Sequence, residues 1–202
     1  EEWVAKPSDL LIVAKMAMAH YQFETLHPFG DGNGRLGRLI SLLQVMQAGE
    51  LRWAALNIAP WFETYRTDYQ DGLMAVTLTG DFSPWVEFFA QGVEIQAREG
   101  LIKIRSLLAI RDRIVSDLRQ KGMRGSPIEL AEVLIGFPVI DVPTVRALIG
   151  KSFQAANTTV GKFIEEGILQ EITGRRQDRL FVASEVFRVI NREEHWVQSP
   201  LS

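Results

Sequence analysis

The stretch that decides the fold is His27-Pro28-Phe29-Gly30-Asp31-Gly32-Asn33-Gly34-Arg35-Leu36-Gly37-Arg38, which combines a histidine, a carboxylate, an amide, two arginines and four glycines. Apolar spacing predicts one helix before it, from about Ser8 to Thr25, and a second helix after it, from Arg35 to Gln47. We therefore expect a tight loop that leads directly into the N-terminus of a helix.

Glycines make this loop a candidate anion site. Gly32 and Gly34 permit positive φ angles and leave backbone N–H groups uncovered, so Gly32-Asn33-Gly34 is expected to form an anion-binding nest. The helix that follows adds the positive end of its dipole. Arg35 and Arg38 are three residues apart, so they share one face of the first turn, from which both can bind phosphate oxygens.

Two more side chains of the loop add chemistry. Asp31 offers a hard oxygen ligand suited to Mg²⁺ that bridges phosphates. Histidine accepts protons near neutral pH, so His27 is the candidate general base. Together these residues predict a polyphosphate site with one metal ligand and one base, as expected for nucleotidyl or phosphoryl transfer. His20, seven residues before His27, is predicted to pack or form a hydrogen bond instead.

A dinucleotide-binding site is rejected. Gly32, Gly34 and Gly37 match G-x-G-x-x-G, but that motif requires a preceding strand and an acidic residue about twenty positions later. Here the preceding segment is helical, and no strand–helix–strand unit follows.

The same residues resemble a known family. The stretch from His27 to Arg38 fits the Fic motif, HPFx[DE]GNGRxxR, at every specified position. The resemblance extends upstream through 19–25 and downstream through 65–70 and 85–89, so it covers about the first half of the chain. It implies a mainly α protein: a Fic-type helical bundle followed, as in many Fic proteins, by a winged-helix domain.

The resemblance implies a protein adenylyltransferase that moves AMP from ATP to a Ser, Thr or Tyr hydroxyl of a target protein or of itself. His27 would be the base and Asp31 the Mg²⁺ ligand. The Asn33 side chain, with the loop amides, would hold the α-phosphate. The residues expected to bind ATP are Gly32, Asn33, Gly34, Arg35, Leu36, Gly37, Arg38, Tyr69 and Gln70.

One of these positions, Gln70, departs from the family. Fic proteins carry a Tyr-Tyr pair that approaches the ribose and base, and here it is Tyr69-Gln70. The amide replaces a stacking ring, which leaves the base preference open. Other functions also stay open: removal of AMP, transfer of another nucleotide, or a nucleotide-sensing transcription regulator.

The bundle is expected to occupy residues 1–100. Trp61–Leu73 is predicted as one helix, and a further helix is predicted to begin at Ser83-Pro84. Phe29 is expected to be buried and to anchor the loop. The apolar residues expected to bury the second helix are Leu39, Leu42, Leu43, Val45 and Met46.

Residues 101–122 are predicted as a linking helix and 123–202 as the winged-helix domain. The elements predicted there are helices over Pro127–Ile135, Thr144–Ile149 (capped by Asp141) and Phe153–Glu166, and a hairpin of Glu171–Thr173 with Leu180–Ala183. DNA binding is not favoured, because residues 151–202 hold seven Lys/Arg and seven Asp/Glu. Arg175, Arg176 and Arg179 are the candidate phosphate contacts at the wing tip. Regulation, dimerisation with a second copy, or target docking is preferred.

Composition adds weaker constraints. The net charge of −3 gives no general attraction to nucleic acid or lipid, and the absence of cysteine excludes disulfides. The given sequence contains no apolar run long enough for a membrane span and no signal-peptide pattern, so a cytoplasmic protein is expected. The chain begins at Glu1, and the family's hairpin flap and inhibitory glutamate-bearing helix are not found before Thr25. We therefore expect the N-terminal part of the catalytic core to be missing.

Overall fold

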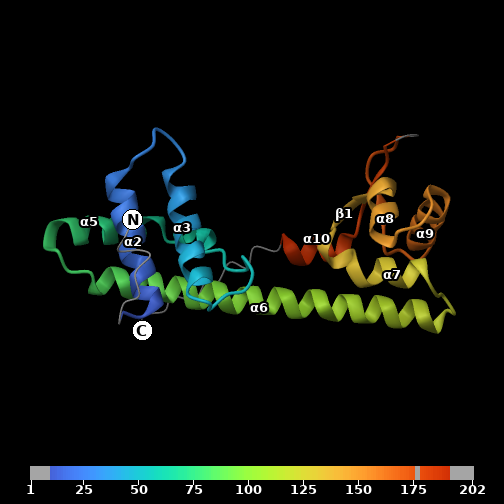
Figure 1. Ribbon diagram of the computed structural model, residues 1–202, viewed down its shortest axis with the longest axis horizontal. Helices are drawn as coiled ribbons and strands as arrows, with labels where there is room; N and C mark the ends of the chain where they lie inside the picture. The colour runs from blue at the N-terminus through green and yellow to red at the C-terminus, as the bar shows by residue number, and fades with distance from the viewer. Residues whose placement is uncertain (1–9, 176–177, 192–202) are drawn as a thin grey trace. The chain divides into compact units, whose positions relative to one another are not determined.

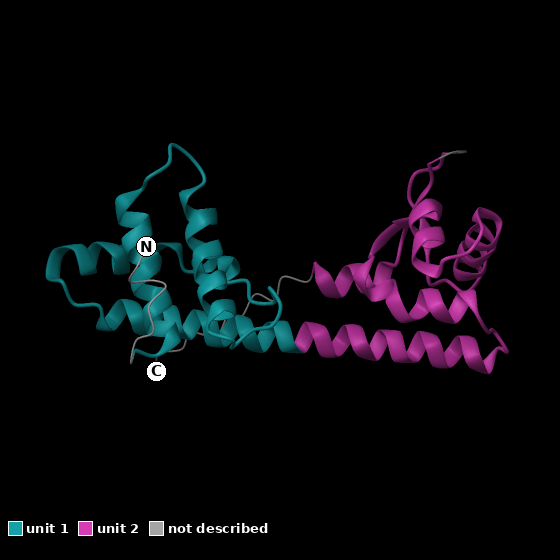
Figure 2. Ribbon diagram, in the orientation of Figure 1, with its two compact units in different colours: residues 1–101 teal, residues 102–202 magenta. Residues whose placement is uncertain are grey.

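The computed structural model describes residues 10–175 and 178–191. The chain divides into two compact units, residues 1–101 and residues 102–202, which are described separately (Figure 2). Helix α6 (Ser83–Gln120) is continuous across this boundary, so it contributes its first part to unit 1 and the rest to unit 2. The segment predicted as a linking helix, residues 101–122, is the C-terminal part of α6, which ends at Gln120.

Unit 1 is a helical bundle. Helix α2 (Ile12–Leu26) and helix α3 (Asn33–Gln47) pack side by side and are joined at one end by the glycine-rich loop (Figure 1). The Trp85 indole of α6 is buried and donates a hydrogen bond to the Ala17 carbonyl at 2.8 Å. The core combines aliphatic and aromatic side chains: Met16, Ala17, Val45, Ile58, Trp61, Phe62, Val76, Trp85 and Phe89.

The predicted helix Trp61–Leu73 is wrong as a single element. The structure has α4 (Ala59–Thr64) and α5 (Arg66–Thr79), separated at Tyr65, whose φ of −108° and ψ of 46° lie outside the helical region. The Tyr65 ring packs on Trp61, with ring centroids 4.2 Å apart. The break lets aromatic side chains of both short helices enter the same core.

The buried face of α3 also differs from the prediction. Leu39 and Leu43 are about half exposed, and Phe29 is 52% exposed, so these three residues do not anchor the core. The side chains of α3 that are buried are small or polar: Asn33, Gly37, Ser41, Gln44 and Val45. Small residues on this face let α2 approach closely, which a leucine stripe would prevent.

Unit 2 combines helices with a small sheet. Its elements after α6 are α7 (Ser126–Val133), η1 (Leu134–Gly136), β1 (Val139–Asp141), α8 (Val142–Ile149), α9 (Phe153–Glu165), β2 (Gln170–Glu171), β3 (Leu180–Val182) and α10 (Ser184–Ile190). The sheet is antiparallel in the order β1-β3-β2, with Val182 opposite both Val139 and Gln170. The hairpin was predicted, whereas β1 was missed: it pairs with β3, about forty residues further along the chain, and not with a sequence neighbour.

Local signals place two helices of unit 2 correctly. The Asp141 carboxylate accepts the Thr144 N–H at 2.8 Å and caps α8. The Ser152 hydroxyl accepts the Ala155 N–H at 3.2 Å and caps α9. The fold is thus mainly helical with a small antiparallel sheet. Among the described residues, no helix has both the length and the apolar character needed to cross a membrane.

Candidate phosphate-binding site

The loop between α2 and α3 reverses the chain through two left-handed residues. His27 ends α2 with φ 43° and ψ 56°, and Gly32 precedes α3 with φ 84°. Glycine adopts this conformation freely, whereas for His27 it is uncommon and carries a cost that functional sites often tolerate. His27 is exposed at the start of the loop.

Asn33 holds the loop in shape. Its buried side chain accepts the Phe29 N–H at 3.1 Å and donates to the Phe29 carbonyl at 2.6 Å. Both ends of the amide are therefore used inside the protein. We propose that this side chain supports the loop, while its contact with the α-phosphate stays a prediction.

The anion-binding amides lie one residue later than expected. The Gly32 N–H is bound by Asp31 Oδ1 at 2.7 Å, and the first intrahelical bond runs from the Leu36 N–H to the Gly32 carbonyl. The N–H groups of Asn33, Gly34 and Arg35 have no intrahelical acceptor at this helix start. We propose these three amides as the anion-binding groups at the start of α3.

Both arginines fold back over the glycines. The Arg35 guanidinium lies 3.4 Å from the position that a Cβ on Gly32 would occupy, and Arg38 Nη1 lies 3.5 Å from the equivalent position at Gly34. An added Cβ at either glycine would make an ordinary van der Waals contact with the nearby guanidinium. Two positive charges therefore lie close to the start of α3.

Asp31 offers one carboxylate to a metal ion, which needs further ligands from elsewhere. Its carboxylate is exposed and lies 3.5 Å from Arg35 Nη2. Within the described residues, no group of three or more histidine or acidic side chains could hold a metal ion. Mg²⁺ is commonly bound by one or two carboxylates together with the substrate's phosphates, and a single carboxylate suits an ion that arrives in that way.

The prediction that His20 packs or forms a hydrogen bond is confirmed, but its partners in a buried polar cluster beneath the loop were not predicted. His20 Nε2 lies 3.1 Å from the Tyr69 hydroxyl and 3.9 Å from Glu24 Oε1. Burial lowers the pKa of His20 to about 4, raises the pKa of the Tyr69 phenol, and raises the pKa of the Glu24 carboxyl. The spacing of His20 and Glu24, one helical turn apart on a face that also leads to His27, was the available signal.

The other residues predicted to bind ATP differ in their surroundings. Tyr69 packs its ring against Phe62 and Trp85, and its hydroxyl bonds to His20, so we propose that it supports the loop. Gln70 is exposed on α5, and Leu36 is half-buried. Gly37 is buried against α2, where it serves packing.

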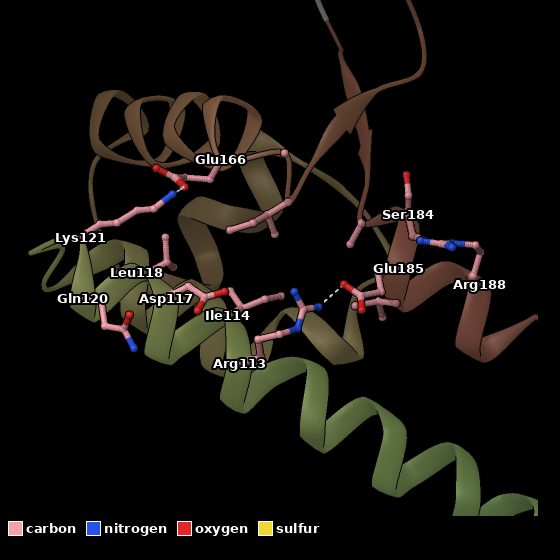
Figure 3. A pocket seen from close by; sticks show the side chains of 14 residues that line it. Arg113, Ile114, Asp117, Leu118, Gln120, Lys121, Glu166, Ser184, Glu185 and Arg188 are labelled. Atoms are coloured by element: carbon pink, nitrogen blue, oxygen red, sulfur yellow. Dashed lines mark hydrogen bonds and ion pairs between the residues drawn. The ribbon is translucent and has the colours of Figure 1, made fainter.

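Two cavities in the described part of the chain differ in how they relate to the predicted site. One of about 120 Å³ is lined by Arg38 together with Leu39, Asn57 and neighbouring residues of unit 1. Another, of about 590 Å³, lies in unit 2 between the end of α6, the turn after α9 and the start of α10 (Figure 3). The ion pairs Arg113–Glu185 and Lys121–Glu166 flank it, and no predicted site residue lines it.

The described geometry is that of a helical domain in which a loop with exposed amides and arginines joins two helices. Residues 1–45 match the Fic/DOC family. The chain is 36% identical over 96 residues to the protein adenylyltransferase Fic of Aedes aegypti, covering 46% of this chain and 18% of that protein. It is 37% identical over 109 residues to protein adenylyltransferase fic-1 of Caenorhabditis elegans, covering 52% and 20%. The N-terminal part of the chain is thus similar to the Fic/DOC family.

A bacterial relative matches more of the chain. A probable protein adenylyltransferase of Aquifex aeolicus is 30% identical over 166 residues, which is 80% of this chain and 50% of that protein. The crystal structure of a Fic family protein from Desulfovibrio desulfuricans superposes with a TM-score of 0.47 and 19% identity, covering 90% of this chain and 52% of that one. The chain thus spans about half the length of the Aquifex relative and about a fifth of the animal ones.

Proposed function

We propose that unit 1 transfers AMP from ATP to a Ser, Thr or Tyr hydroxyl of a protein. One observation carries this proposal: Arg35 and Arg38 fold back over Gly32 and Gly34 at the start of α3, while His27 stands exposed at the end of α2. Phosphate-binding groups and a candidate base therefore border one loop. The names of the relatives, protein adenylyltransferases, support the same reaction.

His27 acts on the attacking group. It accepts the proton of the target hydroxyl as that oxygen forms a bond to the α-phosphorus of ATP. The bond between the α-phosphorus and the oxygen that bridges to the β-phosphate breaks, and pyrophosphate leaves. The product is AMP joined to the target through a phosphodiester, with the proton on His27.

The start of α3 binds the phosphates. The N–H groups of Asn33, Gly34 and Arg35 suit the α-phosphate, where negative charge develops. The guanidinium groups of Arg35 and Arg38 suit the β- and γ-phosphates, which leave together. Asp31 would hold Mg²⁺ that enters with the nucleotide, and the bound ion would neutralise phosphate charge.

We interpret unit 2 as a winged-helix module that docks or regulates. Its order, α7-β1-α8-α9-β2-β3, supports this interpretation. The wing residue Arg179 is engaged within the unit: it donates to Asn157 at 3.2 Å, lies 3.5 Å from Glu171 and stacks over Phe181. This engagement argues against its use on DNA phosphates. Of its predicted companions, Arg175 is exposed and Arg176 lies outside the described residues.

Intact-protein and peptide mass spectrometry tests the reaction. The chain is incubated with Mg-ATP, alone and with cell lysate, beside the variant His27→Ala. The proposal predicts an AMP adduct on a hydroxyl side chain that disappears in the variant. An adduct of equal yield in the variant would remove His27 from the mechanism.

A further inference from the structure

A buried carboxyl group lies beneath the loop, and the proposed reaction does not use it. Glu24 sits on α2, one turn before His27, with its side chain 13% exposed. Its Oε1 atom is buried and has no hydrogen-bond partner among the residues that the structure describes. The nearby His20 Nε2, at 3.9 Å, is beyond hydrogen-bonding distance. A buried carboxyl oxygen without a hydrogen-bond partner requires an explanation.

The carboxyl group reaches the first turn of α3. Glu24 Oε1 lies 2.8 Å from the position that a Cβ on Gly37 would occupy, so it is pressed against the backbone of that helix. It lies 3.8 Å from the equivalent position at Gly34, which Arg38 Nη1 approaches to 3.5 Å. Glu24 and Arg38 therefore border the same small space under the phosphate-binding end of α3.

The charges that act on Glu24 come from the loop. Burial raises the pKa of its carboxyl group, and the charges of His27 and Arg38 oppose that rise. The other facing groups, His20 on α2 and Tyr69 on α5, are neutral near pH 7, since burial lowers the pKa of His20 to about 4 and raises that of Tyr69. The ionised form of Glu24 thus depends in part on Arg38, a cation that a polyphosphate would bind.

We propose that Glu24 is the counter-ion of the empty loop and takes up one proton from solution when a polyphosphate binds. The inference rests on the proposed function in one respect, that the loop binds polyphosphate. The phosphates neutralise Arg38 and bring negative charge close to a carboxylate that little water screens. Protonation removes the repulsion without moving α2 or α3. Glu24 therefore makes nucleotide affinity depend on pH.

The variant Glu24→Gln removes the charge of the side chain and keeps its size, so it tests the charge alone. Calorimetry would measure the affinity for ADP and for tripolyphosphate at about pH 8 and at about pH 6. We expect the variant to bind both compounds more tightly than the parent, by roughly tenfold at the higher pH and by less at the lower pH. Glu63→Gln, at an exposed position on α4, is the matched control and should leave both affinities unchanged.

A second measurement keeps the test decisive if Glu24→Gln fails to fold. Carboxyl-carbon NMR of the parent should show the Glu24 signal move toward its protonated position when tripolyphosphate is added. A merely structural role predicts weaker binding in the variant and a stationary signal, and either result overturns the inference.

The two proposals fail in different ways. Tighter binding by Glu24→Gln without any AMP adduct supports the counter-ion and refutes the transfer reaction. AMP transfer with equal affinities in the variant and the parent overturns the counter-ion alone. If neither phosphate compound binds, both proposals are wrong.

Discussion

The Tyr69 hydroxyl lies 3.1 Å from His20 Nε2, a contact that joins α5 to α2 inside unit 1. His20 in turn faces Gly37 of α3, because its Nδ1 atom lies 3.2 Å from the position of an added Cβ. Three helices therefore meet at one neutral imidazole directly beneath the loop. The position and orientation of the phosphate-binding residues depend on this packing.

Tyr69→Phe removes the hydroxyl and keeps the ring. The loss of one partly buried hydrogen bond should lower the free energy of unfolding by about 1 kcal/mol. Because Tyr69 is assigned to support, ATP affinity should stay within about twofold of the parent, measured by calorimetry at a temperature where both are folded. A large loss of affinity without a loss of stability would return Tyr69 to the nucleotide site.

Gly37→Ala should damage the contact between α2 and α3. The added Cβ would stand 2.8 Å from Glu24 Oε1 and 3.1 Å from His20 Cε1, both held in a packed interior. We expect a loss of about 1–3 kcal/mol in thermal or denaturant unfolding. Gly30→Ala is the control, since no atom lies within 4 Å of its added Cβ. Equal stability of the two variants would show that the interface tolerates a methyl group.

Asn33→Ala removes both hydrogen bonds to the Phe29 backbone. The variant should lose about 1–2 kcal/mol, because it loses two partly buried hydrogen bonds to the Phe29 backbone. Hydrogen exchange of the Phe29 amide should become faster, while exchange in α5 stays unchanged. Asn57→Ala, at an exposed position where the side chain accepts one N–H bond from Ala59, serves as the comparison. Unaltered exchange at Phe29 would contradict the assigned role of Asn33.

The buried His20 should make unit 1 sensitive to acid. Its pKa is about 4 in the folded chain and 6.5 as the ordinary value, so between these values the unfolded state binds a proton that the folded state refuses. The contribution of His20 to the free energy of unfolding is therefore fully present above pH 6.5. It falls as the pH is lowered, by up to about 3 kcal/mol near pH 4. Nitrogen NMR should show the His20 imidazole neutral down to about pH 5. Titration near its ordinary pKa would contradict this burial.

Much of the site was predictable because the signals are local. The glycines, the arginines and the flanking apolar spacing place the loop between two helices, and the caps at Asp141 and Ser152 place two helices of unit 2. Such features depend on residues within a few positions of one another. The sequence alone therefore predicts a loop between two helices and the start of α8 and α9.

Other features depend on distant packing and were missed. The Leu39 and Leu43 pattern predicts a buried stripe, but Gly37 and Ser41 bring α2 against the opposite face of α3. The partnership of Tyr69 with His20 joins residues 49 positions apart, which no local pattern encodes. The N–H groups without an intrahelical acceptor begin at Asn33 and not, as expected, at Gly32, because the Asp31 side chain accepts the Gly32 N–H.

The measurement that tests the central claim most directly is label transfer from ATP that carries radioactive phosphorus at either the α or the γ position. The account predicts that protein becomes labelled from the α position only, that His27→Ala abolishes labelling, and that this variant still binds ATP with nearly the parent affinity. Labelling from the γ position would show phosphoryl transfer instead. Loss of ATP binding in His27→Ala to the same degree as labelling would contradict its role as the base.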